Sequence, residues 1–258
     1  TTEIYTLSLH DALPIYRVPD PELMLRGYER AALTLNFVRS LLDGGFADLH
    51  HPENWDLNFV GESPQAAEYH KLVKSVSDSL EFFEAITGEP LHRTHRVEFY
   101  ASHEGLHLPY EQAQTRFLPR RQRWYNLTTH FPWIGMRTAD LRGGHVEYFR
   151  GIANPIAVKI GTGTTDEHLQ GLVHVLNPNN EPGRLTFITR FGAKNVATHL
   201  PRAIRSVRQT GSRVLWVCDP MHGNTESTAD GIKTRRFDNI LAELRAAFRI
   251  HEEMGSIL

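Results

Sequence analysis

The chain has 258 residues, of which 40% are hydrophobic and 22% are charged, and its formal net charge is -2 at pH 7. This length can bury one sizeable hydrophobic core, and the small charge gives no electrostatic reason to expect a nucleic-acid or membrane partner. The one cysteine excludes an internal disulfide framework, and no apolar run approaches the roughly 18 residues of a membrane span. We therefore expect an α/β domain that works in the cytoplasm.

The first residues differ in the character of their sequence from the rest of the chain. Segment 1–16 has no basic n-region and no signal-like cleavage site, so it is not a secretory peptide. It resembles translated sequencing-adapter sequence, and we expect it to be non-native. Residues 17–258 are then the domain itself.

Two helices are predicted before the first strand. Apolar residues recur at helical spacing over Arg26–Leu42, and a second helix is predicted from Ser63, as N-cap, with Pro64 at its first position. Gly88 follows the second helix as a C-cap. We expect the two helices to pair and to form a helical insertion near residues 26–88.

Short apolar strands and helices alternate along the rest of the chain. The predicted strands are Val97–Ala101, Leu127–Ile134, Ile156–Ile160, Leu185–Thr189 and Val214–Cys218, and the predicted helices are Asp166–Leu176, Pro201–Gln209 and Phe237–Ile250. Lys159 lies 31 residues before Arg190, and Arg190 lies 29 residues before Asp219. A (β/α)₈ barrel uses roughly 31 residues per unit, so the spacing favours a barrel, although a doubly wound open sheet gives similar spacing.

Polar residues follow the strands. Arg137, Lys159, Arg190 and His222 each stand at or just after a strand end, and the carboxyl ends of barrel strands meet at one rim. Arginine and lysine together make a site for phosphate or carboxylate, while the alternative is that they are solvated charges or ion-pair partners. The loop 161–165 adds a weak candidate for backbone phosphate binding.

Segment 103–107 matches the H-E-x-x-H pattern of zinc proteases. That pattern needs both histidines on one helical face, but Gly105 lies inside it and Pro109 follows closely. We therefore expect a strand end that turns into a helix, and a metalloprotease is a remote alternative. The arginine-rich run 116–123 is interpreted as a solvated loop rather than a nucleic-acid site.

Several longer motifs resemble one family. They are Phe99–Glu104, Trp133–Thr138, Arg150–Ile156, Pro182–Thr186, Asp219–Thr225 and Lys233–Asp238. These segments are similar to those of the class II (plant-type) 3-deoxy-D-arabino-heptulosonate 7-phosphate (DAHP) synthases, and the resemblance extends from about Val18 to about Gly255.

The resemblance implies a TIM barrel with extra helices and a condensation of phosphoenolpyruvate with erythrose 4-phosphate that releases phosphate. It also implies that Arg137, Lys159 and Arg190 hold phosphoenolpyruvate, with the backbone of Met136 nearby. His222 is implied as a ligand of a divalent metal, Mn²⁺ or Co²⁺, which polarises the aldehyde. Met136 stands where many members carry glutamate.

The resemblance also identifies what this chain lacks. The cysteine, glutamate and aspartate metal ligands of the family lie on strands that have no counterpart here. We therefore expect an incomplete barrel, with about five of eight strands, that is an inactive internal fragment of an enzyme forming homo-oligomers when complete. The alternative is a non-catalytic barrel relative that binds a phosphorylated metabolite or a partner.

Overall fold

The structure is a computed structural model. It describes residues 20–46, 48, 63–64, 66–88 and 98–258, so the expectation for segment 1–16 lies outside the described residues. Residues from Tyr100 to Leu258 form one compact unit, and the described residues between 18 and 99 belong to a second. The two units are described separately below.

The second unit contains two long helices, as predicted. Helix α1 (Pro21–Asp43) begins after Asp20, whose carboxylate accepts hydrogen bonds from two backbone N–H groups of the first turn. It ends at Gly44, whose N–H donates to the carbonyl of Ser40. The start of α1 lies five residues before the predicted one because the Asp20 cap and the proline at the first position set the beginning, rather than the apolar stripe.

Helix α2 (Ala66–Thr87) ends as predicted at Gly88, which has φ +68° and donates its N–H to the carbonyl of Glu84. The predicted start at Ser63 and Pro64 falls before the helix. Neither α1 nor α2 has a buried side chain, so the pairing of the two helices stays a prediction.

A parallel sheet lies at the centre of the first unit. Its strands, in spatial order, are β3 (Trp133–Ile134), β4 (Ile156–Ile160), β5 (Leu185–Thr189) and β6 (Leu215–Cys218). The extended segment 101–105 adds a position beside β3 through a parallel bridge between Glu104 and Trp133. Five neighbouring strand positions therefore follow one another in chain order.

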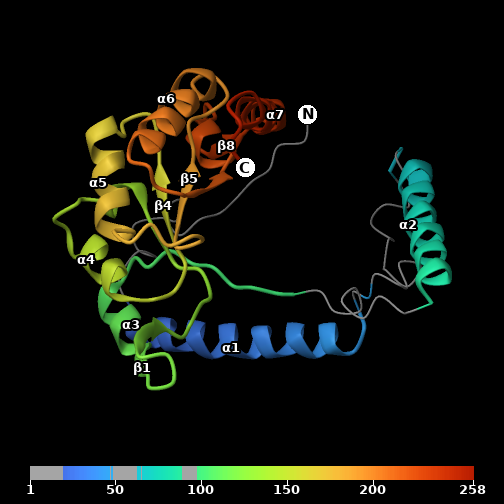
Figure 1. The fold of residues 1–258 in the computed structure, drawn as a ribbon, viewed down its shortest axis with the longest axis horizontal. Helices are drawn as coiled ribbons and strands as arrows, with labels where there is room; N and C mark the ends of the chain where they lie inside the picture. The colour runs from blue at the N-terminus through green and yellow to red at the C-terminus, as the bar shows by residue number, and fades with distance from the viewer. Residues whose placement is uncertain (1–19, 47, 49–62, 65, 89–97) are drawn as a thin grey trace. The chain divides into compact units, whose positions relative to one another are not determined.

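A helix follows each of these strands along the chain. These helices are α4 (Gly144–Gly151), α5 (Asp166–Leu176), α6 (Val196–Gln209) and α7 (Phe237–Glu253). Figure 1 shows α4 to α7 following one another around the strands. A doubly wound sheet reverses its strand order at a switch point, whereas the described strands never do. The α/β class is confirmed, and the strand order is consistent with a TIM-barrel-like fold, although the described strands close no barrel.

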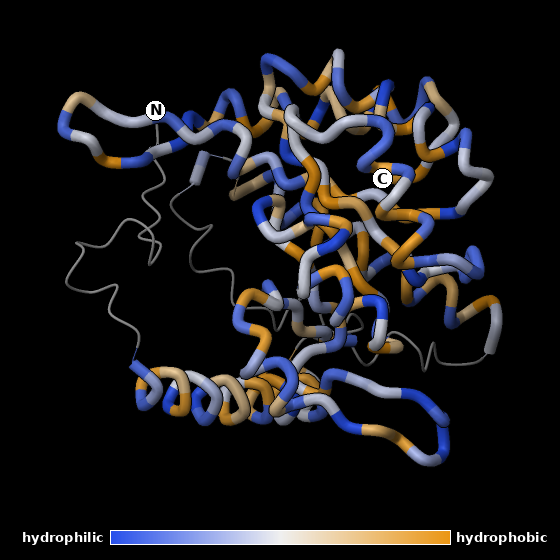
Figure 2. Tube along the Cα trace, turned by 90° about the vertical axis from the view of Figure 1, so that its left-hand side faces the viewer, coloured by the Kyte–Doolittle hydropathy of each residue, from blue (hydrophilic) through white to orange (hydrophobic). Residues whose placement is uncertain are grey.

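The core lies between this sheet and its helices. All five residues of β5 and four of the five of β4 are buried. Helices cover the face of the sheet that carries Ile156, Val158 and Phe187. Phe149, Leu172, Leu200 and Ile204 bring the helices onto that face, and each is at most 1% exposed. Figure 2 shows hydrophobic residues running through the middle of this unit.

Two predicted strands have the wrong bounds. Within the described part of Val97–Ala101 there is no regular strand, because pairing occurs further along, where Trp133 N–H donates to the carbonyl of His103. The predicted strand Leu127–Ile134 is reduced to β3. Pro132, which has no N–H for a ladder, and a turn held by the Asn126 side chain occupy the remainder.

Helix α6 also differs from the prediction, because it begins five residues before Pro201. Val196 and Leu200 in the added turn are 1% and 0% exposed. Burying one such side chain contributes about 1.5–3 kcal/mol, so two of them offset a proline cost of about 3 kcal/mol inside a helix.

Smaller elements were not predicted. They are α4, the hairpin of β1 (Thr115–Leu118) and β2 (Arg123–Asn126), the hairpin of β7 (Thr225–Ser227) and β8 (Lys233–Arg235), and the 3₁₀ turns η4 (Met136–Thr138) and η5 (His222–Asn224). Helix α3 (Leu108–Ala113) is the helix expected after segment 103–107. The arginine-rich run 116–123 is solvent-exposed, as interpreted, but it is a hairpin rather than an irregular loop.

Within the described ranges, no helix is both long enough and apolar enough to cross a membrane.

Candidate functional site

The carboxyl ends of β4 and β6 are joined by an ion pair. Lys159 Nζ lies 2.8 Å from Asp219 Oδ2, and both side chains are nearly buried, with 12% and 11% exposed. The same ammonium lies 4.3 Å from the centroid of the Trp133 ring. Burial by itself would raise the pKa of Asp219, but the hydrogen bond and charge of Lys159, followed by His222, hold that pKa below its usual value. Asp219 is therefore ionised at neutral pH.

Asp219 also fixes His222. Its two carboxylate oxygens lie 2.9 and 2.7 Å from His222 Nδ1, and Oδ1 accepts hydrogen bonds from the backbone N–H groups of Met221 and His222. The side chain of His222 is half exposed, and its Nε2 has no hydrogen-bond partner within the described part of the chain. One carboxylate thus sets both the loop and the orientation of the imidazole.

Arg190 joins this arrangement from the end of β5. Its Nη2 donates a 2.8 Å hydrogen bond to the carbonyl oxygen of His222, and its backbone N–H continues the ladder to Ile160. The structure therefore links three of the predicted residues, Lys159, Arg190 and His222, through one carboxylate and one carbonyl.

Arg137 lies apart from that group. It is in η4, after β3, its side chain is exposed, and it makes no hydrogen bond to Lys159, Arg190 or His222. Its neighbour Met136 is 43% exposed, but the Met136 sulfur lies over Gly161, where an added Cβ would be 2.7 Å from it. Met136 thus places η4 beside the end of β4.

The loops after β5 and β6 touch through glycines. An added Cβ on Gly192, which has φ +83°, would lie 2.6 Å from the carbonyl oxygen of Gly223. An added Cβ on Gly223 would lie 2.5 Å from Gly192 N. Only glycines allow this approach of one backbone to the other, and it brings the residues after Arg190 and His222 together.

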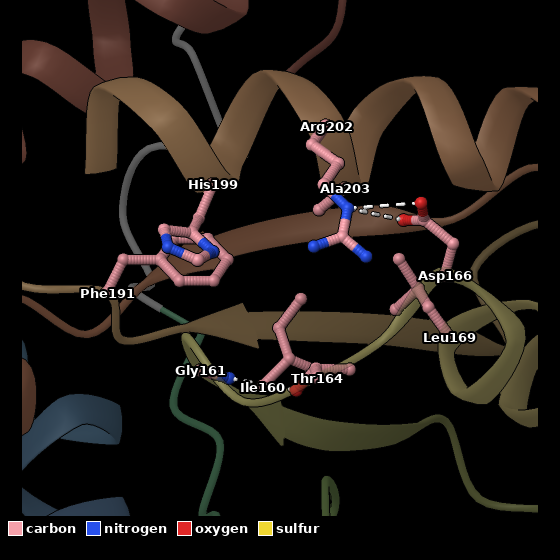
Figure 3. Close-up of a pocket in the computed structure, with 9 residues that line it drawn as sticks. All are labelled: Ile160, Gly161, Thr164, Asp166, Leu169, Phe191, His199, Arg202 and Ala203. Carbon is pink, nitrogen blue, oxygen red and sulfur yellow. Dashed lines mark hydrogen bonds and ion pairs between the residues drawn. The ribbon is translucent and has the colours of Figure 1, made fainter. Parts of the chain in front are cut away.

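The weak phosphate-loop candidate at 161–165 is already hydrogen-bonded to its own side chains. Thr164 Oγ1 accepts from Gly161 N–H, and Thr165 Oγ1 accepts from His168 N–H. Figure 3 shows the pocket beside this loop, where Arg202 on α6 pairs with Asp166 on α5. None of the four predicted strand-end residues lines this pocket.

The H-E-x-x-H segment is a strand end followed by a helix, as predicted. His103 Nε2 lies 2.9 Å from buried Glu111, whereas His107 accepts a hydrogen bond from Tyr110 N–H as the N-cap of α3. The two histidines therefore serve different partners. Glu104 belongs instead to the extended segment that pairs with β3. Its carboxylate lies against Gly135 at the end of β3.

The roles of three residues of the site were not predicted from the sequence. The three are Asp219, Asn224 and Glu243, although Asp219 and Asn224 belong to the motif Asp219–Thr225. Their signal was weak: Asp219 and Asn224 stand in the motif that ends β6, and Glu243 is a lone carboxylate on the face of α7 that carries Ala247 and Ile250.

Metal-ligand side chains are sparse in this region. Over the residues that the structure describes, no group of three or more His, Cys, Asp or Glu side chains gathers in a geometry for a metal. Cys218, inside β6, has its pKa raised to about 12, chiefly by burial, so its thiol is protonated at neutral pH.

Comparison with known proteins gives a consistent result. Residues 8–258 match the family model described as the Class-II DAHP synthetase family. A phospho-2-dehydro-3-deoxyheptonate aldolase of Neurospora crassa is 42% identical over 261 residues, which cover 95% of this chain and 54% of that protein. Proteins with the same function in their names from Streptomyces coelicolor and Mycolicibacterium smegmatis are 42% and 41% identical, and the match covers 93% of this chain and 53% of each relative. The chain spans about half the length of these curated relatives.

Proposed function

The chain belongs to the class-II DAHP synthetase family, and we propose that it carries the phosphoenolpyruvate-binding part of a 3-deoxy-7-phosphoheptulonate synthase site. That enzyme condenses phosphoenolpyruvate with D-erythrose 4-phosphate to give DAHP and phosphate, the first step of the shikimate pathway. The observation that carries this proposal is the linked set of Lys159, Asp219, His222 and Arg190 at the carboxyl ends of adjacent parallel strands.

Charge and hydrogen-bonding capacity support an anionic ligand. A lysine ammonium has three donors and a guanidinium has five, so Lys159 and Arg190 keep free donors beyond the contacts with Asp219 and His222. Phosphoenolpyruvate carries a carboxylate and a phosphate, which arginine can bind bidentately. We assign Arg137 and the backbone of Met136 to the same ligand, because Met136 places their turn beside the end of β4.

The residues present fit one position of a divalent metal site. Asp219 holds His222 through Nδ1, which leaves Nε2 as the ligand atom, and a carboxylate behind a metal-binding histidine is the usual arrangement. When bound, Mn²⁺ or Co²⁺ supplies a Lewis acid for the aldehyde of erythrose 4-phosphate. The chain itself contributes the orientation of the imidazole and the binding of the anion.

The test is phosphoenolpyruvate binding by isothermal titration calorimetry. Arg190→Ala removes donors from the site and should weaken binding at least about tenfold, because charge-assisted pairs in a partly buried site are strong and each tenfold corresponds to about 1.4 kcal/mol. Arg202→Ala is the matched control, since it removes an arginine that pairs with Asp166 away from the site. Equal affinity of the Arg190→Ala protein and the unmodified chain would exclude the assignment.

A further inference from the structure

Helix α7 carries a carboxylate where a hydrophobic side chain is expected. Glu243 has 0% of its surface exposed, and burying an unpaired carboxylate would cost several kcal/mol. Glu243 Oε1 accepts hydrogen bonds from the backbone N–H groups of Phe191, at 3.0 Å, and Gly192, at 2.9 Å. Its Oε2 accepts a 2.6 Å hydrogen bond from Asn224 Nδ2. Both oxygens are therefore paired.

These partners come from two different loops. Phe191 and Gly192 directly follow Arg190 after β5, whereas Asn224 lies two residues after His222 in the loop after β6. Asn224 adds its own link between the loops, because its Oδ1 accepts from Ala193 N–H at 2.9 Å. Its Nδ2 also donates to the carbonyl of Pro220 at 2.8 Å.

We propose that Glu243 is a positioning residue that fixes Arg190 and His222 relative to each other by binding both loops to α7. This inference rests on the proposed function, since it concerns the same site. Glu243 touches neither side chain directly and acts through the backbone of Phe191 and Gly192 and through the side chain of Asn224.

The chemistry of the partners explains why the residue is a glutamate. All three groups that face it are donors, and an ionised carboxylate is an acceptor at both oxygens. Burial raises the pKa of Glu243, and the N–H groups of Gly192 and Phe191, followed by Asn224, oppose that rise by stabilising the anion. A glutamine would turn one N–H₂ toward a donor, so it cannot bind both loops at once.

The experiment compares Glu243→Gln with Glu252→Gln, which removes a carboxylate from an exposed position of the same helix. Phosphoenolpyruvate affinity is measured by calorimetry on proteins whose folding is verified by circular dichroism. Glu243→Gln should bind about tenfold more weakly, as expected for the loss of a hydrogen bond to a charged group. Glu252→Gln should bind as the unmodified chain does. A folded Glu243→Gln protein with unchanged affinity would overturn the proposal.

Nuclear magnetic resonance separates this proposal from the proposed function. In Glu243→Gln, but not in Glu252→Gln, the signals of the His222 ring and the Arg190 guanidinium should shift, whether or not phosphoenolpyruvate binds. Unshifted signals contradict the positioning role, whereas an unmodified chain that binds no phosphoenolpyruvate contradicts the proposed function alone.

If Glu243→Gln fails to fold, two further measurements decide. In the unmodified chain the amide hydrogens of Phe191 and Gly192 should exchange slowly, and rapid exchange refutes the proposal. Asn224→Ala keeps both backbone bonds to Glu243 and removes the hydrogen bonds that join the loop after β6 to Glu243 and to Ala193. It should shift the His222 ring signals, and their constancy would likewise refute the proposal.

Discussion

At the scale of single residues, the site depends on the contact between Gly192 and Gly223. An added Cβ at Gly223 would lie 2.5 Å from Gly192 N and 3.0 Å from the carbonyl carbon of Arg190. Both neighbours are backbone, so they cannot move without moving the loop. Gly223→Ala should therefore lower the free energy of unfolding by about 1–3 kcal/mol, as overpacking does.

Gly163→Ala is the control for this prediction, because an added Cβ there has no atom within 4 Å. Its effect should stay within about 0.5 kcal/mol. Urea denaturation of the two proteins makes the comparison. Equal stability of both would show that the loops after β5 and β6 are further apart in solution.

A second residue predicts a pH dependence of stability. His251 is 2% exposed and its Nε2 has no hydrogen-bond partner, while Nδ1 lies 2.8 Å from Ser256 Oγ. Burial lowers the pKa of His251 below its usual value of 6.5. The unfolded state then binds the proton more readily, so the free energy of unfolding should fall as the pH drops below about 6.5, by at most about 1.4 kcal/mol per pH unit.

The His251 contribution is isolated by comparing variants. His251→Gln should flatten the fall in unfolding free energy between pH 7 and 5, whereas His174→Gln, which alters an exposed histidine of α5, should keep it. The measurement is chemical denaturation at several pH values. Parallel curves for the unmodified chain and His251→Gln would assign the pH dependence to other groups.

Three residues of the site could be predicted from the sequence more easily than the residue that holds them in position. Lys159, Arg190 and His222 stand at strand ends, and the ends of parallel strands meet at one edge, so their proximity could be predicted. The role of Glu243 could not, because it depends on two loops that arrive from elsewhere in the chain. Arg137 follows the same rule as the others, yet a 3₁₀ turn places its side chain in solvent.

At the scale of elements, α7 shows where an apolar pattern misleads. The apolar residues of the predicted helix Phe237–Ile250 include Phe237 and Phe248, but these side chains are 53% and 58% exposed. The helix instead buries Glu243, Ala247 and Ile250. A hydrophobic pattern identifies the helix correctly, but it cannot identify which face meets the sheet when a buried carboxylate belongs to that face.

This assignment of faces is testable on one helix. Ile250 is 6% exposed, so Ile250→Ala should lower the free energy of unfolding by about 2–5 kcal/mol. Phe248→Ala should cost less than about 1 kcal/mol, because an exposed side chain leaves no cavity. Thermal and urea denaturation give both values. A large loss from Phe248→Ala would mean that this stripe is covered in solution.

The boundaries of the other elements were predicted accurately where they depend on residues nearby in the sequence. Strands β4 and β5 and helix α5 begin and end at the predicted residues, because their apolar patterns stop at Gly161, Arg190 and Asn177. By contrast, the extended segment 101–105 and β3 depend on each other for pairing. Their bounds are set by the partner strand rather than by their own residues.

At the scale of the whole molecule, the strand order is consistent with a barrel and distinguishes it from a doubly wound sheet better than the spacing does. Periodicity left a barrel and a doubly wound sheet open, since both repeat at similar intervals. The described strands are adjacent in chain order from segment 101–105 through β6. Every crossover therefore advances in one direction, which places successive strand ends, and the cations that follow them, along one rim.

The last prediction concerns catalysis by the 258-residue chain. The family resemblance assigns one metal ligand, His222, to this sequence, and a catalytic divalent site normally takes three protein ligands or more. The chain should therefore bind phosphoenolpyruvate at the anion site but should not catalyse the condensation, because the aldehyde is not polarised. A phosphate-release assay with both substrates and Mn²⁺ or Co²⁺ should show no rate above background, while the Neurospora crassa relative, assayed beside it, serves as the positive control.

Turnover by the 258-residue chain would show instead that other residues complete the metal site. In that case His222→Ala would identify whether the imidazole is one of the ligands, because the activity should then be lost and should not return when the metal concentration is raised.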